Sequence, residues 1–106
     1  MSGQERRRTP RSKAPNDVLV AWQTGTQKAV SRLDTIALGG LFILTKAPAA
    51  KQSMVQLLVE APTGDVRARA VVRWSKPETG MGVEFVAMAP EDRARLAQFL
   101  HRLSPA

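Results

Sequence analysis

Between residues 66 and 74, apolar side chains recur at every second position, and this pattern constrains the fold of the 106-residue chain more than any other feature. The apolar positions are Val66, Ala68, Ala70, Val72 and Trp74, and the positions between them include Arg67, Arg69 and Arg73. Since successive side chains of a β-strand point to opposite faces, the pattern predicts a half-buried strand with its arginines in solvent. Trp74, like Trp22 in an earlier apolar segment, is expected to pack in the core rather than to stack on a base.

Five further segments have the composition or the alternation of strands. They cover residues 18–22, 28–33, 41–45, 54–60 and 81–85. Short turns separate them, among them a tight turn at Gly39 and Gly40 and a hairpin turn at residues 62–65. Roughly six strands within about 70 residues are typical of an antiparallel barrel or sandwich.

An amphipathic helix is predicted after the last of these strands. Pro90 suits the first turn of a helix, and Glu91 and Asp92 are favourably placed at the positive end of its dipole. An apolar stripe at helical spacing follows, at Leu96, Phe99, Leu100 and Leu103. The predicted fold is therefore mainly β, with a C-terminal helix that covers an open end or seam of a barrel.

The first residues of the chain have a different character. Residues 1–16 contain many charges and two prolines but nothing to bury, so they are predicted to form a flexible basic arm, with residues 17–106 as the barrel domain. The net charge of the chain is +7, and much of it lies in this arm, at Arg6, Arg7, Arg8, Arg11 and Lys13. Such an arm indicates an anionic partner, either a nucleotide, a nucleic acid or an anionic surface.

Composition excludes several classes of protein. The chain has no cysteine and one histidine, His101, so it offers no disulfide, no thiolate metal site and no cysteine nucleophile. No nucleophile is paired with a base and no Walker-type phosphate loop is present, so we expect a binding module rather than an enzyme, with no catalytic residue and no metal. The longest apolar run, residues 36–44, is far shorter than the roughly 20 residues of a membrane helix, and no apolar segment of a signal peptide follows the basic N-terminus. A cytoplasmic location is expected.

Three segments carry a likeness to a known family. They are Glu-Arg-Arg-Arg-Thr-Pro-Arg at residues 5–11, Ile-Ala-Leu-Gly-Gly-Leu-Phe-Ile at 36–43, and Gly-Met-Gly-Val-Glu-Phe at 80–85 followed by Pro90 and the helix. With these segments the chain resembles the PilZ domain, a bacterial receptor module for cyclic di-GMP, along essentially its whole length. The resemblance implies a six-stranded antiparallel barrel with a C-terminal helix, which agrees with the strand count.

The resemblance also implies a ligand site, whose first motif is RxxxR. Arg7 and Arg11 match the two arginine positions, and Arg6 matches an additional upstream arginine of some members. Arginine suits this role because its planar fork pairs with O6 and N7 of guanine and also binds phosphate. Two such residues on a flexible arm are expected to wrap over the ligand and become ordered with it.

The second motif of the family, usually [D/N]xSxxG, is altered in this chain. Thr35 stands at the position of Asp or Asn, Ala37 at that of Ser, and Gly40 at the glycine. A register shifted by one residue would use Asp34 and Gly39 instead. Because neighbouring strand residues point to opposite faces, Asp34 reaches the ligand only if a local bulge turns it.

These two positions matter because the N1/N2 edge of guanine donates hydrogen bonds and needs an acceptor. Thr35 retains a hydroxyl, whereas Ala37 has no polar group. If both interactions were lost without compensation, the cost would be about 2–4.5 kcal/mol, or about 30- to 2,000-fold in affinity.

Two functions are compatible with the resemblance. The intact RxxxR favours a cyclic di-GMP receptor that relays the second messenger to a motility, pilus or biofilm component through contact with an unidentified protein. The altered second motif favours a PilZ-like adaptor that has lost the ligand and acts through protein partners only. Nucleic-acid binding by the arm is a third hypothesis, which the resemblance disfavours.

Overall fold

The computed structural model describes residues 11–103 and contains seven strands and one helix. The elements are β1 (Ser12–Lys13), β2 (Leu19–Gln23), β3 (Lys28–Ala37), β4 (Gly40–Leu44), β5 (Met54–Ala61), β6 (Gly64–Lys76), β7 (Gly80–Ala87) and α1 (Pro90–Leu103). All of the strand segments predicted from the sequence are present, and β3 and β6 are longer than predicted.

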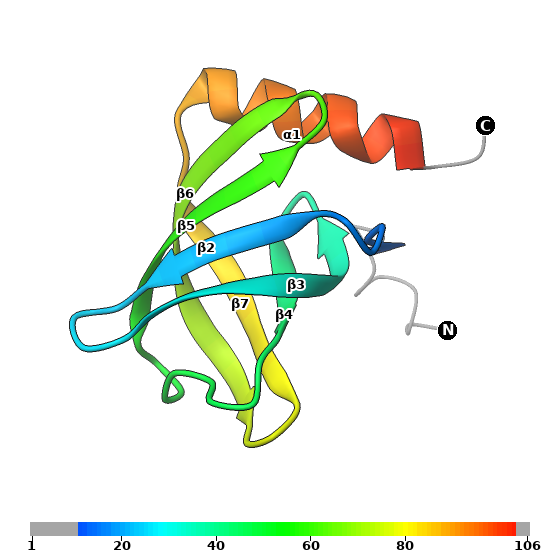
Figure 1. Cartoon of the computed structure of the whole chain (residues 1–106). Helices are drawn as coiled ribbons and strands as arrows, with labels where there is room; N and C mark the ends of the chain where they lie inside the picture. The colour runs from blue at the N-terminus through cyan, green and yellow to red at the C-terminus, as the bar shows by residue number, and fades with distance from the viewer. Residues whose placement is uncertain (1–10, 104–106) are drawn as a thin grey trace, which may run out of the picture.

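Strands β2 to β7 form a closed antiparallel barrel (Figure 1). The strand order is β3-β2-β5-β6-β7-β4, and β4 pairs back with β3 to close the cylinder. The predicted fold class is therefore confirmed. β1 adds two residues to β3, pairing Ser12 with Ile36 and Lys13 with Thr35. The sequence does not show this strand, because two residues are too few to display a period.

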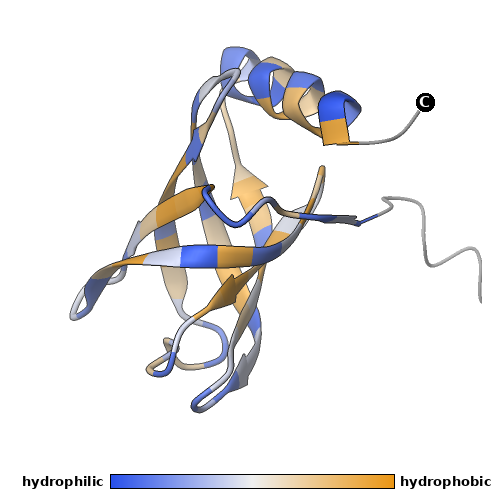
Figure 2. Cartoon of the chain, turned by 45° about the vertical axis from the view of Figure 1, so that its right-hand side comes forward, coloured by the Kyte–Doolittle hydropathy of each residue, from blue (hydrophilic) through white to orange (hydrophobic). Residues whose placement is uncertain are grey.

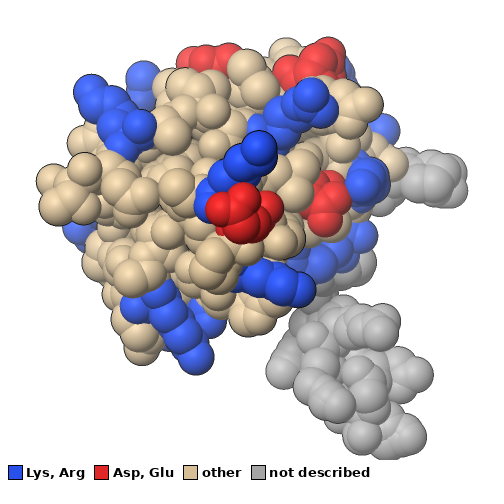
Figure 3. Space-filling model, turned by 60° about the horizontal axis from the view of Figure 1, so that its bottom comes forward, with Lys and Arg blue, Asp and Glu red and all other residues tan. Residues whose placement is uncertain are grey.

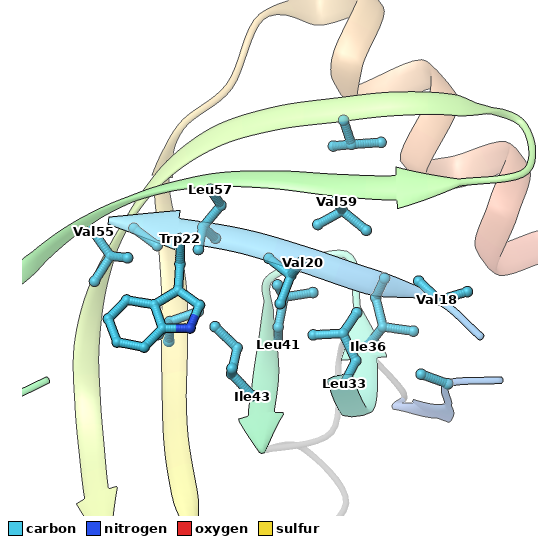
Figure 4. Close-up of a cluster of buried hydrophobic side chains, with 14 of the residues drawn as sticks. Val18, Val20, Trp22, Leu33, Ile36, Leu41, Ile43, Val55, Leu57 and Val59 are labelled. Atoms are coloured by element: carbon cyan, nitrogen blue, oxygen red, sulfur yellow. The ribbon is translucent and has the colours of Figure 1, made fainter. Parts of the chain in front are cut away.

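Alternation along the strands builds one hydrophobic core inside the barrel. The ribbon in Figure 2 changes repeatedly between hydrophobic and hydrophilic colours along the strands. Inward side chains such as Val20, Ile36, Leu41 and Ile43 are fully buried and meet at the centre (Figure 4). Trp22 lies among them, and its indole Nε1 donates to Ser31 Oγ at 3.0 Å. The prediction that Trp22 packs in the core is confirmed.

Closure of the barrel depends on two glycines, at the seam where β4 meets β7. A Cβ at Gly40 would collide with the backbone oxygen of Val83, and a Cβ at Gly80 would collide with that of Ile43. Neither glycine has a positive φ, so the requirement is for space rather than for an unusual backbone conformation. Glycine at these positions therefore allows the two backbones to approach closely.

Helix α1 lies across one end of the barrel, beside the hairpin of β5 and β6 (Figure 1). It begins at Pro90 as predicted, and Leu96 and Phe99 of its apolar stripe are buried in the core. Asp92 in the first turn is 8% exposed. Its Oδ1 accepts hydrogen bonds from the backbone N–H of Arg67 at 3.0 Å and from Nη2 of Arg95 at 3.1 Å, so this carboxylate joins the helix to β6.

The prediction for Trp74 is wrong, because this side chain lies on the outside of the barrel and is 49% exposed. The pairing of β6 with β7 changes register between Val72 and Trp74, which places both Arg73 and Trp74 in solvent. A bulge of this kind lets two consecutive residues leave the core. The predicted solvent position of Arg67, Arg69 and Arg73 is confirmed.

The space requirement at the seam can be tested with Gly40→Ala. We expect it to lower the free energy of unfolding by about 1–3 kcal/mol, because the new methyl group meets backbone that cannot move without disturbing the sheet. Gly25→Ala is the matched control, since a Cβ there has no neighbour within 4 Å. Thermal unfolding of both variants measures the difference. Equal unfolding midpoints for the two variants would contradict the space requirement at Gly40.

The role of Asp92 can be tested through pH. The Arg67 backbone hydrogen bond lowers the pKa of Asp92, burial opposes it, and the Arg95 side chain lowers it further, so the pKa lies below the ordinary 3.8. The carboxylate therefore contributes stability that is complete above about pH 5 and is lost as pH falls through the folded-state pKa.

Asp92→Asn is accordingly expected to lower the free energy of unfolding by about 1 kcal/mol at pH 7 and to weaken its dependence on acid. Denaturant titrations between neutral and acid pH measure both effects. Glu91→Gln changes an exposed neighbour of the same charge type and serves as the control. An acid dependence that is the same in Asp92→Asn and in the unmodified chain would exclude this role.

Candidate functional site

A bulge in β3 shapes the segment that matches the second motif. The pairing of β3 with β4 changes register between Leu33 and Thr35. Leu33 and Ile36 both point into the core, at 3% and 0% exposure, although they are three residues apart. Asp34 and Thr35, between them, are both half-buried on the outer side. The bulge thus places Asp34 on the same surface as Thr35, which a regular strand would forbid.

Two cations from the end of the predicted arm lie against these residues. Arg11 Nη1 donates to Thr35 Oγ1 at 2.9 Å, and Lys13 Nζ forms an ion pair with Asp34 Oδ1 at 2.9 Å. The side chain of Lys13 is 77% exposed and that of Asp34 is 36% exposed. An ion pair so open to water contributes about 0–1 kcal/mol. A ligand can therefore replace Lys13 at this carboxylate with little loss.

The remaining positions of the second motif form the turn between β3 and β4. Ala37 pairs with Gly40, is 3% exposed and lies outside the main core cluster. Gly39 accepts a hydrogen bond at its carbonyl oxygen from the backbone N–H of Phe85 at 2.9 Å. Gly40 lies at the seam with β7, where any larger residue would collide with the backbone of Val83. These residues position the site but supply no side-chain donor or acceptor.

An aromatic pair continues this surface across the barrel. Strand register places one row of outward residues side by side on β3, β4, β7 and β6: Thr35, Phe42, Gly82 and Trp74. The rings of Phe42 and Trp74 are 5.3 Å apart between centroids and tilted by 48°. Gly82 between them has no side chain to cover their faces. The row thus joins polar groups at Thr35 to an exposed aromatic surface.

Sequence reasoning missed this aromatic pair, because it assigned Trp74 to the core. The sequence does contain a signal of the bulge in β6, at Val71. Three consecutive apolar residues, Ala70 to Val72, break the alternation, and all three are buried. A break of this kind indicates a bulge, beyond which the side that faces the core changes.

Arg6 and Arg7 lie outside the described residues, so the structure locates only Arg11 of the first motif. Over the face shown in Figure 3, basic side chains are spread out and some have acidic neighbours. Within residues 11–103 no group of three His, Cys, Asp or Glu side chains is arranged to hold a metal ion. No helix among the same residues is long and apolar enough to cross a membrane.

Comparison with known proteins now identifies the class. The family model of the PilZ domain matches residues 5–102, and the chain belongs to this family. The comparison with curated proteins finds no match.

Several solved structures share the fold. The PilZ domain of YcgR from Escherichia coli, solved with c-di-GMP, is 19% identical with a TM-score of 0.73, and the match covers 92% of this chain and 91% of that chain. MrkH of K. pneumonia in complex with c-di-GMP is 18% identical with a TM-score of 0.74, covering 92% and 52%. MotI/DgrA of Bacillus subtilis, an inhibitor of motility, is 22% identical with a TM-score of 0.72, covering 91% and 50%. This chain therefore spans about half the length of MrkH and MotI.

Proposed function

We propose that this chain is a cyclic di-GMP receptor that binds the ligand on the outer surface of β3 and β4, beneath the N-terminal arm. Membership of the PilZ family supports the ligand class. The observation that carries the proposal is the bulge in β3, since it brings a carboxylate, Asp34, to the surface where the second motif has only Thr35 and Ala37. The apparent defect of that motif is thereby compensated by its neighbour.

The proposed roles follow from the chemistry of guanine. Arg7 and Arg11, with Arg6 beside them, bind the O6/N7 edge or a phosphate, as a planar guanidinium does well. The Asp34 carboxylate accepts from the N1/N2 edge. Such a charge-assisted bond contributes about 1.5–3 kcal/mol, whereas a neutral bond contributes about 0.5–1.5 kcal/mol. Asp34 therefore offsets the hydrogen bond that Ala37 does not make.

The turn contributes through its backbone. Gly39 carries no side chain that would separate a ligand from the main chain of the β3–β4 hairpin, and Gly40 holds that hairpin against β7. Thr35 adds one hydroxyl, which Arg11 holds at 2.9 Å in this structure. Arg11 is thus already beside the place where we expect the purine.

The aromatic pair provides a stacking surface for the same ligand. Base stacking on an aromatic side chain contributes about 1–3 kcal/mol. Phe42 stands directly opposite Thr35 across the β3–β4 pairing, and Trp74 is in contact with Phe42. A ligand with two purines can hold one at the polar end of the row and place the other toward Trp74.

The protein then acts as an adaptor in the cytoplasm and not as an enzyme. Binding alters this surface, which then contacts a protein component of motility, pilus or biofilm systems. A second candidate function, an adaptor without ligand, is favoured by one observation: the buried Ala37 has no polar atom in its side chain. The titration below separates the two.

Calorimetric titration with cyclic di-GMP tests the assignment of residues. We expect Asp34→Ala and Arg11→Ala each to weaken binding by about 10- to 150-fold, the loss of one charge-assisted interaction. Thr35→Val, which removes a neutral acceptor, is expected to cost only about 2- to 13-fold. Gly40→Ala is not informative here, because it disturbs the seam of the barrel.

Two exposed residues provide matched controls, Asp17→Ala for the carboxylate and Arg93→Ala for the guanidinium. Both should bind as the unmodified chain does. If Thr35→Val removes binding while Asp34→Ala leaves it intact, the role of Asp34 is wrong. If the unmodified chain releases no heat at millimolar ligand, the ligand-free adaptor is the correct function.

Stacking can be followed by fluorescence, because the chain has two tryptophans and only Trp74 is exposed. We expect cyclic di-GMP to quench part of the emission, and Trp74→Phe to abolish that change. Trp74→Ala should weaken binding by about 5- to 150-fold. Quenching that persists in Trp74→Phe would place the effect at Trp22 and contradict a stacking role.

A further inference from the structure

A second surface, a groove of about 850 Å³, lies away from the proposed ligand site. It crosses the outer side of β3, β2, β5 and β6 and ends at the segment between β7 and α1. Strand register defines one row along it, Val30, Ala21, Leu58 and Arg67. Val30, at the β3 end of the row, is 64% exposed, and Ala21 and Leu58 beside it are partly exposed. The row is therefore apolar from β3 to β5, and it ends in a cation on β6.

Cations stand at the ends of the neighbouring row. Register aligns Lys28, Gln23, Gln56 and Arg69 across the same four strands. Lys28, Arg67 and Arg69 are exposed, and none of their side chains has a hydrogen-bond or ion-pair partner among residues 11–103. The groove thus combines an apolar row with cations on β3 and β6 that have no such partner in the part of the chain that the structure describes.

Among the described residues one carboxylate lines the groove, and it offsets this charge only in part. Asp92 already accepts hydrogen bonds from the backbone of Arg67 and from Arg95. Lys28, Arg67 and Arg69 therefore face a groove whose one carboxylate among the described residues already forms an ion pair with a fourth cation, Arg95. By charge complementarity, the occupant is acidic.

We propose that this groove docks an acidic, amphipathic segment of a partner protein, with apolar side chains on Val30 and Leu58 and carboxylates on Lys28, Arg67 and Arg69. A second copy of the chain fits poorly, because a twofold interface would press this basic groove against itself in a molecule of net charge +7. A nucleic acid would bind the cations but would make no contact with the apolar row.

The groove and the ligand site can be occupied together, because they use different parts of the shared strands. The groove takes residues 28–30 of β3 and 67–69 of β6, whereas the ligand site takes 34–37 of β3 and Trp74 of β6. The inference rests on the proposed function in one respect: if the chain is a receptor, the groove is the surface through which it contacts its partner.

NMR titration of the full isotope-labelled chain tests the proposal, with a 12-residue peptide of alternating Glu and Leu as the probe. We expect saturable shifts at the amides of residues 21–23, 28–30, 56–58 and 67–69, with weak, roughly millimolar affinity. A peptide with Lys in place of Glu and a short DNA duplex are run beside it. Groove shifts that are equal with either of these would overturn the proposal.

Substitutions in the groove test the charged and the apolar contributions to peptide binding separately. The double variant Lys28→Glu with Arg69→Glu is expected to weaken binding of the Glu-Leu peptide by about 10-fold or more. Arg93→Glu with Arg102→Glu makes the same change in net charge on exposed positions of α1 and should have no effect. Arg67 is left unchanged because of its contact with Asp92. Val30→Ser is expected to weaken binding by about 5-fold, and Val86→Ser, at an exposed valine of β7, should not.

The remaining outcomes are equally decisive. An absence of groove shifts with the Glu-Leu peptide, or shifts that survive the double charge reversal, would exclude the docking site. Sedimentation that shows a dimer dissolved by Lys28→Glu with Arg69→Glu would assign the groove to self-association instead. Titration of the same variants with cyclic di-GMP tests the ligand site separately. If the chain binds cyclic di-GMP but not the peptide, only the proposal of a docking groove is wrong.

Discussion

The close approach of β4 to β7 is the contact on which the rest of the structure depends. Together with the pairing of β4 and β3 it closes the barrel, and it is possible only because Gly40 and Gly80 present no Cβ to the backbone of the opposite strand. The same seam fixes the hairpin of β3 and β4, since the carbonyl oxygen of Gly39 accepts from the N–H of Phe85. The segment that carries Asp34 and Thr35 is thereby held in one position. A single steric constraint thus defines both the barrel and the geometry of the candidate site.

Two of the three register shifts between paired strands among the described residues lie at that site, and the third lies between Arg69 and Ala70. One bulge turns Asp34 to the side of Thr35, and the other brings Trp74 out of the core beside Phe42. Leaving a tryptophan half-exposed forgoes burial that would otherwise stabilise the fold. Irregularities of this kind concentrate at sites where a protein uses the residues for something other than packing. The two bulges therefore support the proposal that the row from Thr35 to Trp74 is a binding surface.

The barrel offers two chemically different surfaces on shared strands. The row from Thr35 to Trp74 combines an accessible carboxylate with aromatic rings and suits a purine ligand. The groove over β2 and β5 combines apolar side chains with exposed cations and suits an acidic protein segment. Because the two surfaces use different residues of the shared strands, each can be altered by substitution without removing the other.

The sequence by itself determined the strand segments, the helix with its buried Leu96 and Phe99, the mainly β class and the family. These are local properties, since the period of apolar residues and a short motif can be read without knowing which strands pair. Only the tertiary structure decided that Asp34 shares a surface with Thr35, that β1 pairs with β3 and that Trp74 is exposed. A bulge depends on the register between strands distant in sequence, and one shifted residue reverses which side chains face the core. Local alternation therefore predicts that a strand exists, whereas cross-strand packing decides which of its side chains reach solvent.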